Sequence, residues 1–346
     1  MTNRRTFLRH AALAGAAASL PLAGLTSCST PQKNNPQPTM NNDKNIIGHG
    51  DFRYKVDKSW GTLDPARNAV SHCHEMVMDA RGRLVVSTVS PDQDILAYSK
   101  DGKLEASWKL GLVEPHGFTK AGEGSDQTFW VTDTAGRVVN LDLDGRVIRE
   151  LNAPTEHIPE GKEYKPTETT VAGNGDIYVA DGYGSNKIFH YDGSGRLQNV
   201  FGGDEHFNCC HGIVVDTRRG TPELLITSRA NKEFQRWTMD GKHIKTHKLP
   251  GLEICRPVIS GEHTLFAVIV TKSWWSYDGM VAVLDKDFNV VSLPGGTAPT
   301  SQTDFTNVVP DQTFLNPHDV CTDDDGNLYV PQWYSGRTYP VRLKRV

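Results

Sequence analysis

Four histidines precede apolar, strand-like runs in the same way at four places in the chain. His74 stands in "HCHEMVMD", His116 in "EPHGF", His211 in "CCHGIVVD" and His318 in "NPHDVCTD". Neutral imidazoles are ligands for zinc, iron and copper, and three protein ligands with one open position describe a catalytic zinc site. If the fold brings these residues together, the sequence predicts a transition-metal centre.

The elements that must position these histidines recur at roughly every 40 to 60 residues, a period typical of propeller blades. Alternating apolar runs are separated by Asp-Gly or Gly-Asn turns, as in "GNGDIYVADGYGSNKIFHYDGSGRLQNVFG", and this pattern indicates β-hairpins. Six copies predict an all-β fold, a six-bladed β-propeller. The segment 296–314 lacks the strand pattern, so we expect no seventh blade.

The last copy, "DGNLYVPQWYSGRTYPVRLKRV", ends at Val346 one strand short of a full blade. The segment "FRYKVDKSW" (52–60) precedes the first copy, and we expect it to supply the missing outer strand. Closing the ring in this way removes two open sheet edges that would otherwise invite aggregation.

The innermost strand of each propeller blade runs beside the central axis. Aligning the copies by their strands places six residues at one axial position: His74, His116, Thr167, His211, Pro257 and His318. An isolated histidine before a strand is more often a turn residue, but four histidines at six equivalent positions favour metal ligation. His72 is the alternative inward-pointing side chain in the first blade.

The N-terminus carries an export signal. "NRRTFLR" is a twin-arginine motif, and the apolar run after it ends in the lipobox "LTSC" at Cys28. The apolar run is short and rich in alanine and glycine, which argues against a membrane span. Residues 1–28 are therefore predicted to be a twin-arginine lipoprotein signal, with lipid attachment at Cys28. An ordinary cleaved signal peptide is the alternative.

The polar segment 29–45 is predicted to be a flexible tether, and 46–346 to be the propeller. Removal of residues 1–27 leaves about 34 basic residues against 41 acidic ones, a net charge of about −7, which argues against nucleic acid and against a polybasic membrane-binding face. We expect a cell-envelope protein, periplasmic or at the surface, that contacts the membrane through its lipid alone.

Five cysteines remain after Cys28, and an odd number cannot pair completely in an oxidising compartment. No C-x-x-C pair occurs, so a structural zinc ribbon is not expected.

Several motifs occur together in one order: "EPHGFTK…FWVTD", "KPTETTVAGNGDIYVADGYGSNKI", "HGIVVD…LLITSRANKEFQRW" and "NPHDV…GNLYV". With these motifs the chain resembles the NHL-repeat six-bladed propellers. Among them it is most similar to the peptidyl-hydroxyglycine alpha-amidating lyase (peptidylamidoglycolate lyase) domain, over roughly residues 110–335.

The resemblance assigns roles to individual residues. It implies that His116, His211 and His318 are zinc ligands. It implies a catalytic role for Tyr183 in "DGYGSN" and for Arg229 in "SRAN", and a structural calcium ligand at Asp319.

The chain also departs from the family pattern. The family has an arginine in its first blade where this chain has "SHCHEMVMD", so His74 or His72 occupies that neighbourhood as a fourth ligand or a substrate contact. The family's cysteine after the tyrosine is Gly184 here, so the matching disulfide is absent. Cys73 and Cys210, each directly before a candidate ligand, are not part of the pattern.

The resemblance implies a metal-dependent lyase that cleaves a C–N, or related C–O, bond at a hydroxylated carbon. Its substrate would be a small or peptide-derived molecule in the central channel. Zinc would hold the hydroxyl oxygen, with iron as the alternative metal. Tyr183 would act as a base if Arg229 lowers its pKa.

Two other classes of function remain open at this stage. Four axial histidines also suit a non-haem iron enzyme of the propeller type. A non-catalytic, lipid-anchored binding or scaffold module would instead use "TKSWWSYDGM", with Trp274 and Trp275, as a surface that stacks on sugars or peptides. A sugar-lactone hydrolase would need carboxylates and calcium at an axis that is rich in histidine here. Metal content and turnover separate these hypotheses.

Overall fold

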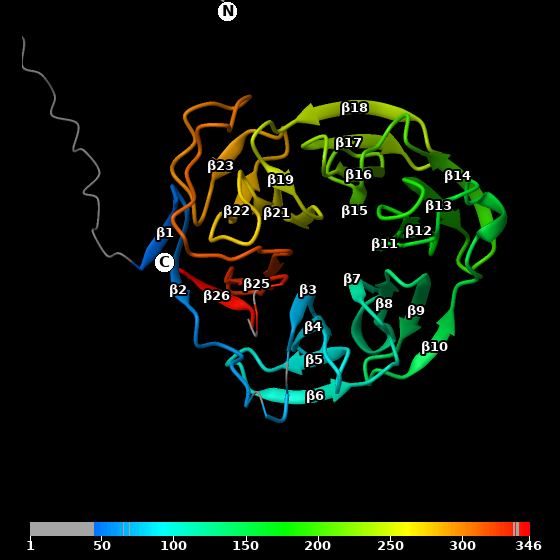
Figure 1. Cartoon of the computed structure of the whole chain (residues 1–346), viewed down its shortest axis with the longest axis horizontal. Coiled ribbons are helices and arrows are strands. Elements are labelled where there is room, and N and C mark those ends of the chain that lie inside the picture. Colours follow the sequence, from blue (N-terminus) through cyan, green and yellow to red (C-terminus); the bar gives the residue numbers. More distant parts are fainter. Residues whose placement is uncertain (1–44, 65, 69, 335, 337–338) are drawn as a thin grey trace, which may run out of the picture. The chain divides into compact units, whose positions relative to one another are not determined.

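Six antiparallel β-sheets are arranged as blades around a central axis (Figure 1). This computed structural model describes residues 45–64, 66–68, 70–334, 336 and 339–346. The predicted signal segment 1–28, Cys28 and all of the predicted tether except Asn45 lie outside the described residues. The predicted all-β six-bladed propeller is confirmed.

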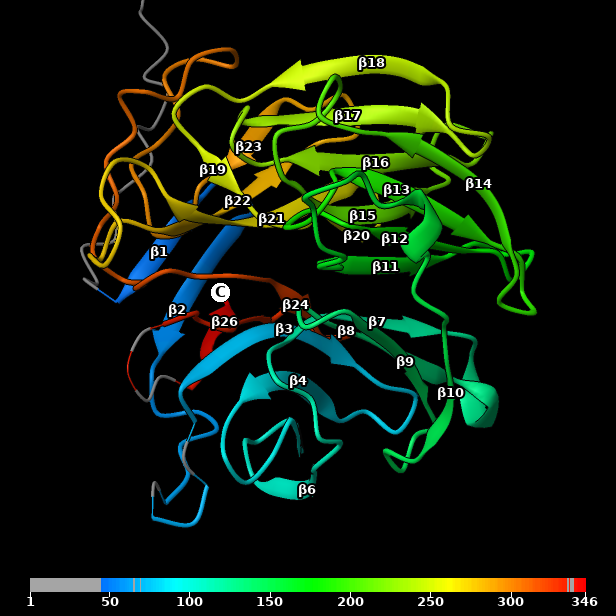
Figure 2. The same ribbon diagram turned by 45° about the vertical axis from the view of Figure 1, so that its right-hand side comes forward.

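The first four blades have four strands each, in sequence order from the axis outward. Blade 1 contains β3 (His72–Met78), β4 (Leu84–Val89), β5 (Ile95–Tyr98) and β6 (Leu104–Trp108), and blade 2 contains β7 (Pro115–Ala121), β8 (Thr128–Asp133), β9 (Arg137–Leu141) and β10 (Val147–Glu150). Blade 3 contains β11 (Glu168–Val171), β12 (Ile177–Ala180), β13 (Lys187–Tyr191) and β14 (Leu197–Gly202), and blade 4 contains β15 (Cys210–Asp216), β16 (Glu223–Ser228), β17 (Glu233–Thr238) and β18 (His243–Lys248). Figure 2 shows blade 4 with β15 innermost and β18 at the outer rim.

Blade 5 has an interrupted inner strand. Both β19 (Glu253–Ile254) and β20 (Val258–Ser260) pair with β21 (His263–Val270), followed outward by β22 (Met280–Leu284) and β23 (Val290–Ser292). Residues 255–257 lie between the two short strands. The segment 296–314 contributes two isolated bridges, Gly296 with Pro310 and Phe314 with Gly279, and no described strand, as expected from its lack of a strand pattern.

The N-terminal segment closes the ring by completing blade 6. This blade runs from β24 (Cys321–Thr322) through β25 (Leu328–Val330) and β26 (Val341–Arg345) to β2 (Phe52–Asp57) and β1 (Ile46–His49). The expected outer strand is confirmed, although it ends at Asp57, and β1 is an additional fifth strand that the sequence analysis did not anticipate. The Asp57 carboxylate accepts a 2.7 Å hydrogen bond from Arg342 across the β2–β26 junction.

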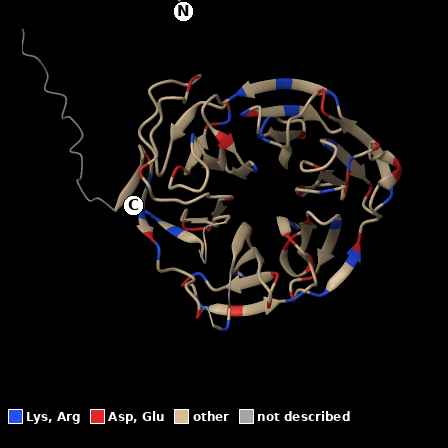
Figure 3. Ribbon diagram, in the orientation of Figure 1, with Lys and Arg blue, Asp and Glu red and all other residues tan. Residues whose placement is uncertain are grey.

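The hydrophobic core lies between the blades. One cluster of buried side chains fills the space between each pair of neighbouring blades, such as the cluster of Tyr54, Leu265 and Val341 between blades 5 and 6. Because the cores flank the axis, the centre of the ring is left to polar side chains, and these form the candidate site. Basic and acidic residues are interspersed around the ring (Figure 3).

Candidate metal centre and catalytic residues

The inner strands bring two consecutive residues to the axis. The pairing register shifts between Cys73 and Met76 in β3, with equivalent shifts in β7 and β15. A regular strand sends successive side chains to opposite faces, whereas a bulge redirects them. The histidine therefore enters one axial layer and the residue after it enters a second layer.

The first layer, called here the histidine layer, gathers all four predicted histidines. The ring centroids of His74, His116, His211 and His318 lie 4.8 to 5.0 Å apart in five of their pairings. All four side chains are buried. The structure thus places at one point four residues that span 244 positions of sequence.

Two sets of ligand atoms within this layer lie close enough to hold one ion. One set is His74, His116 and His318, the other is His211, Cys255 and His318, and within each set the ligand atoms lie within 4.8 Å of one another. The predicted trio of His116, His211 and His318 is therefore drawn from both sets, with His318 common to them. In blade 1 it is His74, and not His72, that joins the layer: the His72 ring instead stacks on Tyr334.

Cys255 is the axial residue of blade 5, and the alignment of Pro257 to this position was wrong. The break between β19 and β20 shifts the axial position by two residues relative to the strand pattern. The sequence did contain a signal for the correct position. In His74-Glu75 and His318-Asp319 the axial residue is followed directly by a charged residue, and Cys255-Arg256 repeats this pattern. The five described cysteines have free thiols.

The chemistry of the histidine layer fits a transition metal. Burial lowers the pKa of His116 to about 3 and places those of His74, His211 and His318 well below the ordinary value, so the imidazoles are neutral at physiological pH. The His116 Nδ1 is 2.8 Å from the Thr167 carbonyl oxygen, a contact that assigns its proton to Nδ1 and leaves Nε2 as the electron-pair donor. Neutral imidazoles next to a thiol suit zinc.

Tyr183 and Arg229, to which the resemblance assigns catalytic roles, lie at the edge of this layer. The Tyr183 hydroxyl is 3.2 Å from the Nε2 atoms of both His116 and His211, and Arg229 Nη2 donates to the same oxygen at 3.1 Å. The loop that carries Tyr183 is held by Asp181, which accepts hydrogen bonds from Ser185 and from the Lys165 backbone. The hydroxyl is therefore enclosed, although 39% of the Tyr183 surface is exposed.

The condition under which Tyr183 would act as a base, a pKa lowered by Arg229, is not met in the protein alone. Burial of the hydroxyl raises the pKa of Tyr183 to about 12, and Arg229 opposes this shift without reversing it. Tyr183 is consequently a protonated phenol at neutral pH in this arrangement.

The second axial layer, called here the carboxylate layer, consists of Glu75, Glu168, Asp319 and Arg256. Arg256 donates two hydrogen bonds to Asp319, from Nε at 2.9 Å and from Nη2 at 2.8 Å. Its Nη1 lies 3.1 Å from Glu75 and 3.4 Å from Glu168. These side chains come from blades 1, 3, 5 and 6, and all are buried.

Arg256 also reaches the other two blades. It donates to the carbonyl of Phe118 in blade 2, at 3.0 Å. In blade 4, a Cβ on Gly212 would lie 2.3 Å from the Arg256 Cα, so this position requires glycine. From blade 5, the Arg256 side chain therefore bonds to blades 1, 2, 3 and 6, and its backbone packs against Gly212 of blade 4.

The carboxylate layer does not fit the calcium ion that the resemblance implied at Asp319. Both Asp319 oxygens already accept from Arg256, and Oδ2 also accepts from the Met76 backbone. Among the described residues, the groups of metal-binding side chains do not include Asp319. Arg256, which sequence analysis did not single out, supplies the positive charge in its place.

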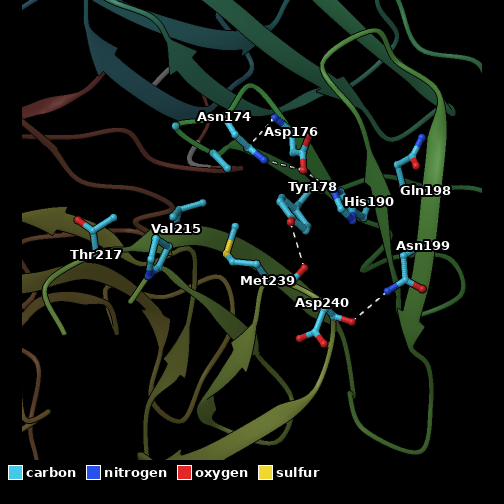
Figure 4. Close-up of a pocket in the computed structure, with 13 residues that line it drawn as sticks. Asn174, Asp176, Tyr178, His190, Gln198, Asn199, Val215, Thr217, Met239 and Asp240 are labelled. Carbon is cyan, nitrogen blue, oxygen red and sulfur yellow. Dashed lines mark hydrogen bonds and ion pairs between the residues drawn. The ribbon is translucent and has the colours of Figure 1, made fainter. Parts of the chain in front are cut away.

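A separate groove of about 770 Å³ lies between blades 3 and 4 (Figure 4). Its lining includes Ala172 and Gly173, which follow the end of β11 opposite to Thr167. Tyr178 stacks on His190 there, with 4.4 Å between ring centroids. This groove is therefore distinct from the axial layers.

Comparison with known proteins confirms the predicted resemblance. The chain is 23% identical over 265 residues to a probable peptidyl-alpha-hydroxyglycine alpha-amidating lyase of Caenorhabditis elegans, covering 73% of this chain and 71% of that protein. It is 28% identical over 198 residues to peptidyl-alpha-hydroxyglycine alpha-amidating lyase 1 of Drosophila melanogaster, covering 52% of this chain and 33% of that one. It is 23% identical to the human NHL repeat-containing protein 3, covering 54% of this chain and 57% of the other. No family model matches.

Solved structures show the same fold at lower sequence identity. The virginiamycin B lyase of Staphylococcus aureus aligns with a TM-score of 0.53 and 15% identity, covering 81% of this chain and 82% of that one. A gluconolactonase of Xanthomonas campestris aligns with a TM-score of 0.58 and 12% identity, covering 86% and 94%. These likenesses concern the fold alone. Within the described part of the chain, no helix has the length and apolar character needed to cross a membrane.

Proposed function

We propose that this protein is a metal-dependent lyase that cleaves the C–N bond, or a related C–O bond, at a hydroxylated carbon. The single observation that carries this proposal is the position of the Tyr183 hydroxyl between the Nε2 atoms of His116 and His211 and the Arg229 guanidinium. The likeness to amidating lyases supports a peptidyl-α-hydroxyglycine, or a compound with the same carbinolamide group, as the substrate.

The reaction requires transfer of one proton. As the C–N bond breaks, its electron pair leaves with nitrogen, the hydroxylated carbon becomes a carbonyl, and the hydroxyl proton is lost while nitrogen gains one. The products are an amide and an aldehyde, and no oxidant is consumed. A general acid–base group therefore needs to reach both the oxygen and the nitrogen of the substrate.

Tyr183 is suited to this transfer as a neutral relay. Because its pKa is raised to about 12, the phenol carries a proton that it can donate to the departing nitrogen while it accepts the proton of the substrate hydroxyl. Arg229 holds the phenol oxygen at 3.1 Å and stabilises negative charge on it during the transfer. The buried setting strengthens this interaction.

His116, His211 and His318 would hold a zinc ion, with His74 or Cys255 as a further donor from the same layer. Bound there, zinc supplies Lewis-acid chemistry, which lowers the pKa of a substrate hydroxyl and stabilises developing negative charge. His116 is held in the ligating orientation by its Nδ1 contact with Thr167.

The experiment is turnover of an N-acyl-α-hydroxyglycine by the purified protein, with glyoxylate and the amide measured separately. We expect both products in equal amounts, and we expect Tyr183→Phe to lower kcat by about 10² to 10⁴ because it removes the proton relay. Tyr277→Phe, which changes an exposed tyrosine outside the layer, is the control. No turnover by metal-replete wild type would contradict the proposal.

A non-haem iron enzyme is the second candidate, and the position of His74 favours it. The His74 ring lies 4.8 Å from His116 and 4.9 Å from His318, so four imidazoles are available to one ion. Iron in the purified protein, together with absence of carbinolamide cleavage, would support this candidate. Bound metal without turnover of any substrate would instead favour the binding or scaffold module.

We also propose that the propeller is exported by the twin-arginine route and anchored to the cell envelope through a lipid on Cys28. The lipobox "LTSC" supports this proposal. Expressed with its signal in a bacterium, the wild type should fractionate with membranes, and Cys28→Ala should move it to the soluble fraction. Wild type found wholly in the soluble fraction would rule out the anchor.

A further inference from the structure

Four consecutive blades carry distinctive side chains on equivalent loops. In each of blades 3 to 6, the loop joins the second strand to the third at the histidine end of the axis. The β12–β13 loop carries Tyr183 and the β16–β17 loop carries Arg229. The β21–β22 loop carries Trp274 and Trp275, and the β25–β26 loop carries Trp333 and Tyr334.

The aromatic residues of blades 5 and 6 form one continuous cluster, called here the aromatic rim: Trp274, Trp275, Trp333 and Tyr334. Trp275 contacts Tyr334 with ring centroids 4.5 Å apart and Trp333 with centroids 5.3 Å apart. Trp274 lies edge-on to Trp333 at 6.2 Å. The four aromatic rings thus form one cluster on the loops of blades 5 and 6, at the histidine end of the axis.

The rim is exposed and conformationally costly. Trp275 is 57% exposed and Tyr334 is 54% exposed, although both rings are large and apolar. Both residues also have left-handed backbone angles, with φ of 65° at Trp275 and 48° at Tyr334. Such backbones are unfavourable for bulky residues and concentrate at binding sites. The arrangement is therefore poorly explained by packing.

The rim continues directly into the histidine layer through His72. The His72 ring stacks on Tyr334 at 5.0 Å with an angle of 14°, and the Tyr334 backbone N–H donates to His72 Nδ1 at 3.0 Å. On its other side, the His72 ring lies 6.3 Å from His74. A substrate whose reacting carbon lies among the histidines would place its adjoining part against the rim.

We propose that the aromatic rim binds an aromatic side chain on the residue that precedes the hydroxylated carbon, and so makes the enzyme selective for substrates of that class. This inference rests on the proposed lyase function. Offset or edge-to-face contact with several rings stabilises an aromatic group beyond its buried area. The Tyr183 and Arg229 loops then face the scissile bond, while the loops of blades 5 and 6 face the neighbouring side chain.

An aromatic occupant fits the rim better than a sugar does. Sugar recognition needs free polar side chains beside the stacking rings. Asp278, the carboxylate of the β21–β22 loop, is engaged within its own loop by Thr271, Lys272 and Ser273. Asp278 is therefore not available to bind a sugar hydroxyl, whereas the exposed rings of Trp275 and Tyr334 offer aromatic faces and edges.

The test compares two substrates, N-acetyl-phenylalanyl-α-hydroxyglycine and N-acetyl-alanyl-α-hydroxyglycine, in wild type and Trp275→Ala. We expect Trp275→Ala to raise KM for the phenylalanyl substrate by about tenfold, with kcat unchanged and with less than about a twofold effect on the alanyl substrate. Tyr277→Ala, an equally exposed change in the same loop, should leave both substrates unaffected. Equal effects on the two substrates, or none, would overturn the proposal.

A binding measurement separates this proposal from the lyase function. Quenching of tryptophan fluorescence by N-acetyl-phenylalaninamide, the expected product, reports on the rim without turnover. Saturable quenching that is lost in Trp275→Ala supports the rim even if no substrate is cleaved, in which case the lyase proposal alone fails. Turnover without preference for phenylalanine, or quenching by oligosaccharides in place of the amide, overturns the rim.

Discussion

The histidine layer and the carboxylate layer are adjacent at the same axis, yet they are completed in opposite ways. In the histidine layer, the buried Nδ1 atoms of His74, His211 and His318 have no hydrogen-bond partner of good geometry among the described residues. In the carboxylate layer, Arg256 engages three carboxylates and two backbone carbonyls. The histidine layer therefore has nitrogen atoms free to ligate a metal ion, whereas the carboxylate layer already contains a cation, Arg256.

The difference indicates that the histidine layer serves metal binding and catalysis, whereas the carboxylate layer stabilises the fold. His74, His116 and His211 are positioned by irregularities in their own strands, so we expect the fold to form without a bound ion. The carboxylate layer depends on its arginine, because buried carboxylates without a partner charge are costly. Burial also holds the pKa of Glu75 well above its ordinary range, although Arg256 opposes this shift. The raised pKa favours the neutral acid and so reduces the negative charge that Arg256 has to compensate.

Removing the arginine should have the largest effect on stability. Arg256→Met leaves the buried carboxylates without their cation, and we expect it to lower the free energy of unfolding by about 3 to 5 kcal/mol. Thermal and denaturant unfolding measure the change, and Arg53→Met on the exposed side of β2 is the control. A loss below about 1 kcal/mol would show that Arg256 is not the central connection we describe.

A second substitution at the same position, Arg256→Ala, tests the calcium interpretation. Wild type should unfold at the same temperature with a calcium chelator or with added calcium, because Arg256 fills the carboxylate layer. Arg256→Ala should gain stability when calcium is added, since the vacated carboxylates can bind a hard cation. A wild-type midpoint that falls in the chelator would show that calcium binds despite the arginine.

Removing a histidine should affect chemistry far more than stability. We expect His211→Ala to lose bound metal and to lower kcat/KM by at least about 10³, while the metal-free thermal midpoint changes little. His206→Ala, outside the axis, is the matched control. A variant that unfolds as readily as Arg256→Met would remove the functional distinction between the two layers.

The ion pair of Asp57 and Arg342 at the outer junction provides a smaller, partly buried counterpart to the carboxylate layer. Burial would raise the pKa of Asp57, but hydrogen bonds from Ser59 and Arg342 hold it at about 2. The resulting stability is present above pH ~4 and is lost as the pH falls towards 2, with an upper limit of about 2 kcal/mol. Asp57→Asn should therefore flatten the acid limb of the stability curve between pH 4 and 2. A limb unchanged by the substitution would show that ring closure does not depend on this pair.

The sequence predicted the periodic parts of the molecule well. Asp-Gly turns and alternating apolar runs located the blades, and the missing strand of the last copy located β2. The axial positions of His74, His116, His211 and His318 followed from the same repeat. The prediction of the axial residue in blade 5 was wrong because residues 255–257 interrupt the inner strand. The strand pattern therefore placed Pro257 where Cys255 lies.

The ion pairs between different blades could not be predicted from the sequence repeat. Arg256 meets Asp319 after 63 residues and Glu75 after 181, and no local pattern records such contacts. The same limit applies to the pKa of Tyr183. The resemblance pointed to Arg229, but the burial that raises this pKa arises only when the blades are assembled around the hydroxyl. The calcium role of Asp319 was inferred from the identity of that residue alone, without knowledge that Arg256 binds its carboxylate.

Metal stoichiometry of protein purified without added metal is the most direct test of the two-layer account. Mass spectrometry should find about one transition-metal ion per wild-type chain, most of it zinc, and no stoichiometric calcium. His116→Ala, His211→Ala and His318→Ala should each lose that ion, whereas the control His206→Ala should retain it. Equal metal content in wild type and all three axial variants, or calcium in place of zinc, would contradict the account.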